Sequence, residues 1–315
     1  DSEGGNNGVR VTSDQPVTVY AFNHTNASLD ATAVLPTSNL GDDYILVSHG
    51  DGDTLYGSGQ FGVVAVEENT QVTYTFPEDT KIFGHDLQFS AGESYTLNLD
   101  KGQTHGFTVL DLHGGSGLEI KSSKPVALFG GAQCNSVPAQ GYQYCDHLYE
   151  QIPPVKYWST EYIAVPFSIE SNAVGDVFRI VAAFDNTELK INGVTHSRLD
   201  RGQWVQDTFK APIVLSSNHP VGVMQIEASQ SFETANPNLD HDPFSVMLYG
   251  KEYFSPTNEL ATISHIYAVR GFEAFSKNYI SIIAPDDALD GLTLNDNLVD
   301  TTGFSPLPDT GYVLG

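Results

Sequence analysis

The stretch SSKPVALFGGA at Ser122–Ala132 predicts the fold class of this chain. Three polar residues and one proline come before β-branched, aromatic and small apolar residues. This pattern is typical of a β-strand that follows a tight turn. Similar stretches occur at SDQPVTVYAF (Ser13–Phe22) and SSNHPVGVMQIEA (Ser216–Ala228). Their prolines are Pro16, Pro125 and Pro220. A strand that returns about every 100 residues indicates an internal repeat.

Other elements return in the same order after these strands. An apolar strand, a break and another strand occur as TAVLPTSNLGDDYILVS, LYEQIPPVKYWSTEYIAVPF and FSVMLYGKEYFSPTNELATI. A hairpin with an acidic or Asn-rich turn follows as FGVVAVEENTQVTYTF, VFRIVAAFDNTELKI and NYISIIAPDDALDGLTLN. LNLDKGQTHGF (Leu97–Phe107) returns as SRLDRGQWVQDTF (Ser197–Phe209). We therefore predict one domain over 1–315 built from three repeats, at approximately 9–117, 118–212 and 213–315.

These repeats read as β-structure throughout. No helical periodicity longer than two turns occurs, and Gly, Pro, Asn and Asp separate the apolar runs. The second repeat gives about eight short strands, with Ser122–Lys124 and Asp185–Thr187 as short turns between them. Eight strands divide into two four-stranded meanders, so three repeats predict a six-bladed β-propeller. Tandem packed sandwiches of jelly-roll or Greek-key type are the alternative.

Composition indicates a folded, acidic protein. Hydrophobic residues make up 40% and charged residues 17%, a balance that disordered chains lack. The formal charge of −25 repels phosphate groups, so we expect no nucleic-acid partner. No run of 18 apolar residues and no signal peptide are found in the sequence, so we expect no membrane insertion. Cys134 and Cys145 lie in a short Gly- and Tyr-rich segment and predict a small-loop disulfide, with free core thiols as the alternative.

The chain resembles the IgG Fc-binding protein N-terminal domain family over nearly its whole length. The resemblance rests on VRVTSDQPVTVYAFN, FGVVAVEENTQVTYT, LDKGQT and DVFRIVAAFDNTELKING, and most specifically on Cys134–Pro154, where a cysteine, NSVP and CDHLYEQIPP follow in order. It implies an extracellular or cell-surface module of a larger secreted protein, of the kind found in mucus proteins and bacterial adhesins. It also implies ligand binding without catalysis.

Enzyme signatures are absent or incomplete. His113-Gly-Gly-Ser116-Gly117 lacks a nucleophile elbow and is read as a turn. The ten histidines show no zinc-site spacing, and Cys145, Asp146 and His147 would point to different sides of a strand. We therefore expect no enzyme. A hydrolase with two carboxylates in a cleft is the catalytic alternative, which spacing alone does not place.

Two acidic loops are candidate calcium sites, because Ca²⁺ prefers several loop oxygens. Neither loop has the EF-hand pattern, and a solvated acidic turn is the alternative for each. The candidate ligands are Asp51, Asp53, Asn236, Asn238, Asp240 and Asp242. Calcium is the only cofactor that the sequence suggests.

The longest connections are expected on one face of the domain, since alternate connections of a meander emerge on the same side. These connections are His24–Ala31, His49–Gln60, Pro77–Ser94, Gly131–His147, Ser168–Asp176 and Ser229–Asp242. They carry aromatic residues among Asn, Asp and Gln that suit a sugar ring or a peptide. The candidate ligand-binding residues are Tyr56, Tyr142, Tyr144 and Phe232, with packing of each ring onto the frame as the alternative.

We therefore expect an adhesion or ligand-binding module that recognises a glycan or an extracellular protein through this face. A structural spacer or assembly domain is the second hypothesis. Leu307–Gly311 matches the LPxTG sorting pattern, but only Tyr312–Gly315 follow where an apolar tail is needed. We read Tyr312–Leu314 as a final strand instead.

Overall fold

The structure of the protein is a computed structural model. The structure describes residues 5–24, 28–50, 52, 57–111, 113–138, 145–167, 175–229, 243–254, 281–294 and 297–315. Their regular elements are β-strands and four short 3₁₀ turns. The all-β prediction is confirmed.

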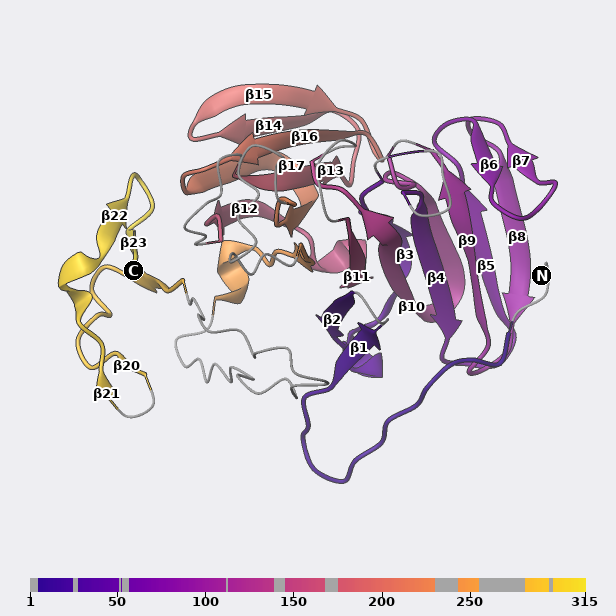
Figure 1. The fold of residues 1–315 in the computed structure, drawn as a ribbon, viewed down its shortest axis with the longest axis horizontal. Coiled ribbons are helices and arrows are strands. Elements are labelled where there is room, and N and C mark those ends of the chain that lie inside the picture. Colours follow the sequence, from indigo (N-terminus) through magenta and orange to yellow (C-terminus); the bar gives the residue numbers. More distant parts are fainter. Residues whose placement is uncertain are drawn as a thin grey trace.

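The first of two large sheets is built from nine strands (Figure 1). Its path runs β7-β6-β9-β4-β10-β5-β8. β4 and β5 pair with one edge of β10, and β3 and β11 pair with the opposite edge. Alternating burial along β4 and β9 follows their alternating apolar residues. The strands are β3 (Gly41–Ile45), β4 (Gly59–Ala65), β5 (Thr70–Thr75), β6 (Thr80–Ile82), β7 (Gln88–Phe89), β8 (Ser94–Leu99), β9 (Thr104–Leu110), β10 (Glu119–Asn135) and β11 (Asp146–Ile152).

The second large sheet has seven strands and the path β15-β14-β17-β13-β16, with β12 and β18 on β17. Read from the other end, this order matches β9-β4-β10-β5-β8 of the first sheet strand for strand. The strands are β12 (Ser159–Ala164), β13 (Asp176–Ala182), β14 (Thr187–Ile191), β15 (Val194–Leu199), β16 (Trp204–Phe209), β17 (Ile213–Ile226) and β18 (Ser245–Met247).

Smaller pieces lie at both ends of the chain. Near the N-terminus β1 (Tyr20–His24) pairs with β2 (Leu29–Ala33). Near the C-terminus β19 (Ile283–Pro285), β23 (Tyr312–Leu314) and β22 (Ser305–Leu307) form a sheet, and β20 (Thr293–Leu294) pairs with β21 (Asn297–Leu298). The 3₁₀ turns are η1 (Thr37–Asn39), η2 (Val155–Tyr157), η3 (Lys251–Tyr253) and η4 (Thr301–Gly303).

The long strands β10 and β17 organise the two sheets, because each changes partners midway. Before Pro125, β10 lies between β3 and β5. After the proline, β4 pairs with it from Val126 and β11 from Leu128. β17 does the same around Pro220, first with β12 and β14, then with β13 and β18. Proline cannot donate to a ladder, so the partner exchange occurs where it interrupts the hydrogen bonding. The predicted turn at Ser122–Lys124 is therefore wrong, since the strand runs through it.

One buried tyrosine fixes each partner exchange. The hydroxyl of Tyr44 donates to the carbonyl of Val126 at 2.5 Å and accepts from the amide of Gly41 at 3.0 Å. In the second sheet, Tyr162 donates to Val221 at 2.6 Å and accepts from Ser159 at 2.9 Å. Both rings are at most 1% exposed. Each tyrosine thus ties the first strand of its sheet to the residue after the proline.

The two sheets share one interface. Val177, Val181, Met224 and Ile226 of the second sheet pack in the same core cluster as the apolar residues of the first. Arg179 of β13 is 2% exposed and donates to the carbonyls of Ser48 and His113, while its guanidinium lies 4.4 Å from the Trp204 ring. Burial lowers the pKa of Arg179 to about 9, so it is charged at neutral pH.

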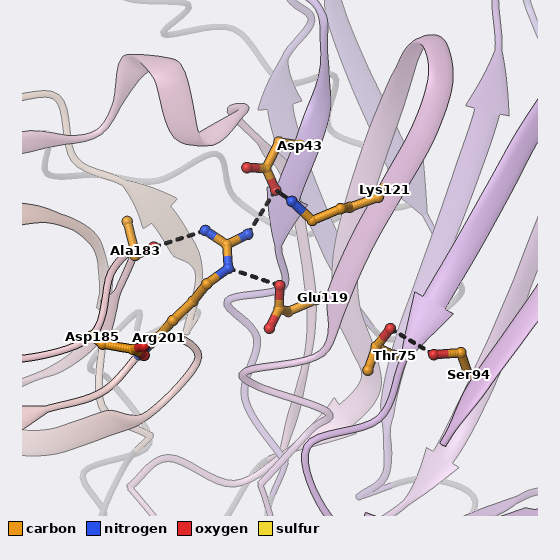
Figure 2. A network of polar contacts seen from close by, with 8 residues as sticks. All are labelled: Asp43, Thr75, Ser94, Glu119, Lys121, Ala183, Asp185 and Arg201. Carbon is orange, nitrogen blue, oxygen red and sulfur yellow. Dashed lines mark hydrogen bonds and ion pairs between the residues drawn. The ribbon is translucent and has the colours of Figure 1, made fainter. Parts of the chain in front are cut away.

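A second arginine bridges the sheets at their outer rim. Figure 2 shows Arg201 between the two sheets, with Nη2 2.7 Å from Asp43, Nε 2.7 Å from Glu119 and Nη1 donating to the carbonyl of Ala183. Lys121 approaches the same Asp43 carboxylate at 3.5 Å. These partners set the relative orientation of the sheets.

Strands β2, β11 and β18 meet through side chains rather than through a backbone ladder. Asp30 accepts from the amide of Tyr149 at 2.7 Å, and Thr32 accepts from Gln151 at 3.0 Å. Glu150 accepts from Met247 of β18 at 3.0 Å. Burial raises the pKa of both Asp30 and Glu150 to about 7. Ionising both carboxyl groups therefore lowers the stability of the folded protein at this junction.

Several boundaries differ from the sequence prediction. Pro77–Ser94 is not one loop, because β6 and β7 lie inside it. Gly131–His147 is shorter as a loop, since β10 continues to Asn135 and β11 begins at Asp146. Leu307 ends β22, and residues 308–311 form the turn to β23. The final strand at Tyr312–Leu314 is confirmed. The six-bladed propeller, the alternative of tandem sandwiches and the threefold repeat stay predictions.

We predict that Tyr44→Phe destabilises the protein by about 1–3 kcal/mol, because it leaves a buried carbonyl and a buried amide without their partner. Chemical denaturation measures this change. Tyr20→Phe is the control, since Tyr20 is 47% exposed, and a change below about 0.5 kcal/mol is expected. Equal stability of the two variants would contradict the role of Tyr44.

We also predict that Glu150→Gln stabilises the protein at pH 8.5 more than at pH 5.5. The folded-state pKa of Glu150 is raised above the ordinary 4.5, so the wild type loses stability as pH rises from about 4.5 to about 7. The amide does not ionise and avoids that loss, which is on the order of 1–2 kcal/mol between the two pH values. Thermal unfolding at both pH values tests this, and a benefit independent of pH would contradict it.

Candidate ligand-binding surface

The described stems of the long loops come together where β10 and β17 end, at Asn135 and Ile226. We call this region the loop end. His49 lies after β3, yet its Nδ1 is 2.9 Å from the side-chain oxygen of Asn135, and its Nε2 is 3.3 Å from the carbonyl of Pro138. The Asn135 amide donates to the carbonyl of Gly57 at 3.0 Å. Buried side chains therefore join the stems of the His49–Gln60 and Gly131–His147 connections.

His49 is held neutral in this network. Burial, with the nearby positive charge of Arg179, lowers its pKa to about 3. A neutral imidazole can donate to only one of these two oxygens, but protonation would place an uncompensated charge in a site that is 1% exposed. His49 is thus a structural residue that joins two loops.

The second sheet contributes its stems to the same place. The amide of Ser229, just after β17, donates to the carbonyl of Val137, and the Ser229 hydroxyl accepts from the Val137 amide, both at 3.0 Å. Gln225 donates to the carbonyl of Val165 at 2.8 Å and to Asp176 at 2.6 Å. The stems of the Ser168–Asp176 and Ser229–Asp242 connections therefore meet those of the first sheet.

The first connection of the chain also reaches this region. The Ser28 hydroxyl contacts the Asp146 carboxylate and accepts from the amide of His147 at 2.7 Å. Five of the six predicted long connections thus have stems that meet here. The sixth, Pro77–Ser94, carries the β6–β7 hairpin.

The disulfide closes the base of one of these loops. Cys134 and Cys145 are bonded with an S–S distance of 2.04 Å, which confirms the pairing predicted from the sequence. Cys134 is the next-to-last residue of β10, and Cys145 immediately precedes β11. Such a link limits the conformations open to the residues between the two cysteines.

A small groove opens on the outer face of the first sheet, beside the loop end. It has a volume of about 250 Å³ and is lined by Gln60, Phe61, Phe83, His85, Gly106, Phe107 and Thr108. Gly106 must be glycine, because a Cβ there would lie 2.0 Å from the carbonyl oxygen of Phe61. The neighbouring Gly62 faces open space. Phe83 is 40% exposed at the rim. The volume is below that of ordinary small-molecule pockets, so the groove suits one residue of a larger ligand.

The candidate ligand and metal residues lie outside the described part of the chain. This applies to Tyr56, Tyr142, Tyr144 and Phe232, and to Asp51, Asp53, Asn236, Asn238, Asp240 and Asp242. Within the described residues no group of three His, Cys, Asp or Glu side chains is close enough to hold a metal ion. Among them, too, no helix is long and apolar enough to span a bilayer.

Sequence reasoning missed His49, Asn135 and the groove. His49 and Asn135 are separated by 86 residues, so only a known strand order brings them together. The groove did leave a signal, since its lining residue Gly106 interrupts the apolar pattern of β9. A glycine inside a strand often marks a site where a ligand or another backbone approaches closely.

Comparison with known proteins gives a consistent result. One curated relative, the human protein named IgGFc-binding protein, is 25% identical over 299 residues, which cover 92% of this chain and 5% of the human protein. The chain therefore spans about one twentieth of that relative. No solved structure matches the chain. The family model described as IgGFc binding protein matches residues 30–314, so the chain belongs to the IgGFc-binding protein family.

Proposed function

We propose that this chain is a non-catalytic, extracellular module that binds a protein surface or a carbohydrate through its loop end and the adjoining groove. The observation that carries the proposal is the joining of five long-loop stems by His49, Asn135, Ser229, Gln225 and Ser28. Loops displayed from a rigid β frame are where recognition usually resides.

Three further features support an extracellular binding role. The disulfide fits an oxidising compartment. The charge of −25 favours solubility and attracts ligands with basic surfaces, at rates that fall with salt. The human relative is named for binding the Fc part of IgG, and this makes Fc the first protein to test. Because this chain covers only 5% of that relative, other extracellular proteins and glycans are equal candidates for its ligand.

A structural or assembly role is the second hypothesis. The chain corresponds to only 5% of the human relative, and a module of a very long protein can serve as a spacer. A spacer does not depend on its loops. The variants below therefore separate the two hypotheses.

We predict that Gly62→Val weakens ligand binding at least tenfold. Gly62 pairs with the groove residue Gly106, and a Cβ added at Gly62 meets no atom within 4 Å. The larger side chain should therefore crowd the groove and leave the fold intact. Immobilised variants are screened against Fc, a panel of extracellular proteins and a glycan array, each with calcium and with EDTA. The loop variant Tyr142→Ala/Tyr144→Ala should weaken the same interaction.

Phe184→Ala is the matched control, because Phe184 is an aromatic residue that is 48% exposed just after β13, at the end opposite the loop end. It should bind as the wild type does. No ligand for the wild type in any screen, or equal loss in the control, would contradict the proposal. Loss of binding in EDTA alone would show that binding requires a divalent cation.

A further inference from the structure

Strand β1 has an open edge and an exposed apolar surface. Within the described residues it pairs only with β2, whereas β10 and β17 have strands on both edges. Val17, Tyr20 and Phe22 are 60%, 47% and 56% exposed. An apolar strand with a free edge favours the addition of another strand.

The register of β1 identifies it as a third strand of the β10 and β17 type. Each of the three strands pairs with a strand that leads into a 3₁₀ turn. In each, the residue four positions after the proline pairs with the residue three positions before the N-cap of that turn. The pairs are Tyr20↔Ala33, Phe129↔Gln151 and Met224↔Met247, before the N-caps Pro36, Pro154 and Gly250.

The segment that leads into β1 supports the same correspondence. Gly117 lies eight residues before Pro125, and a Cβ on it would meet the carbonyl oxygen of Gly202 at 2.4 Å. Gly8 lies eight residues before Pro16, and its Cβ would meet the carbonyl oxygen of Gly102 at 2.6 Å. Gly102 and Gly202 occupy the same position of the DKGQ and DRGQ turns. Both strands are thus approached across equivalent turns.

The C-terminal strands supply the missing partner. In the first sheet, the part of β10 after the proline pairs with β4, and β4 pairs on its other edge with β9. In the second sheet, β17 pairs with β13 and β13 with β16 in the same way. β19 and β23 pair in the same register as β4 with β9 and β13 with β16. The backbone hydrogen bond just beyond each pair of strands shows this. Asp286 donates to Gly311 at 3.1 Å, as Ala65 does to Gln103 at 3.0 Å and Ala182 to Gln203 at 2.9 Å. Unlike β4 and β13, β19 has an open edge among the described strands.

We infer that β19 of the C-terminal segment adds to the open edge of β1 and so closes a third sheet within the same chain. Val126 pairs with Ala65, and Val221 pairs with Ala182. The corresponding pair is Val17 with Asp286, which places Tyr20 opposite Ile283 and Phe22 opposite Ser281.

The hydrogen-bonding groups agree with this register. The carbonyl of Val19 accepts from Val34, so odd-numbered residues of β1 bond to β2 and Tyr20 and Phe22 face the open edge. Ile282 and Asp286 bond toward β23, so Ser281 and Ile283 face the open edge of β19. The residues that face outward on one strand are therefore opposite those that face outward on the other.

The chain is long enough for this closure. β1–β2 and β19–β23 are separate pieces in Figure 1. The residues between Phe254 and Ser281 connect the end of the second sheet to β19. Extended, that segment reaches on the order of 85–90 Å. A partner on the same chain has a high effective concentration, which favours it over a second copy.

Paired cysteines test the closure. Ala21→Cys/Ile282→Cys and Val19→Cys/Ala284→Cys place cysteines at positions in register that do not exchange hydrogen bonds, where Cα atoms are about 4.5 Å apart and a disulfide fits. Under mild oxidation, each pair should give an intrachain disulfide in most molecules, identified by peptide mass spectrometry with Cys134–Cys145 intact.

The same four substitutions provide the control when recombined. Val19→Cys/Ile282→Cys and Ala21→Cys/Ala284→Cys are two residues out of register, at about 8 Å, and should not form the bond. Equal cross-linking in all four variants, or none in the pairs in register, overturns the inference. A cross-linked dimer also overturns it, because a second copy would then supply β19.

Hydrogen exchange of the unmodified chain gives an independent reading. The amides of Tyr20 and Phe22 have no partner on β2. If these amides exchange at least 100-fold more slowly than unprotected amides, the closure is supported. Exchange at the unprotected rate overturns it, whether or not the cysteine variants fold.

Discussion

The hydrogen-bond partners of β10 and β17 are the constraint on which the rest of the structure depends. Each strand exchanges both neighbours at a proline that cannot extend the ladder. The exchange lets one strand pair with four others of its sheet. It also brings the ends of distant connections to a single place, at Asn135 and Ile226.

The interface between the two large sheets is maintained by cations in an acidic protein. Arg179 donates to carbonyl oxygens and stacks on Trp204 inside the interface, whereas Arg201 pairs with carboxylates at its rim. Removing the buried arginine would leave carbonyl groups of Ser48 and His113 without this donor. Ser48 accepts from Arg179 at the interface, and the next residue, His49, contacts Asn135 at the loop end. The same segment therefore links the interface to the loop end.

Much of the fold could be predicted from local patterns. The Pro-led strands and the disulfide depend on residues close in sequence, and these are confirmed. The predicted acidic hairpins are wrong, because β4 and β5 both pair with β10, and β13 and β14 both pair with β17, rather than with each other. The exchange of partners at Pro125 could not be predicted, since a proline after polar residues also reads as a turn. Arg179 gave no signal either, because a single arginine in VFRIVA looks like one exposed position of an alternating strand.

The candidate site was predicted as a region better than as a set of residues. Sorting connections by length placed the long loops on one face, and their described stems do meet. The joining residues His49, Asn135 and Ser229 were not foreseen, because their partners lie 86 to 92 residues away. The groove at Gly106 was overlooked because glycines in strands were read only as interruptions.

Amide exchange along the long strands tests the central claim most directly. If β10 and β17 form the frame, the amides of Val126–Ala132 and Val221–Ile226 should exchange only through global unfolding. Their free energy of opening would then equal the free energy of unfolding from denaturant titration. Opening of either strand at a markedly lower free energy than global unfolding would contradict the claim that these strands hold the loop end together.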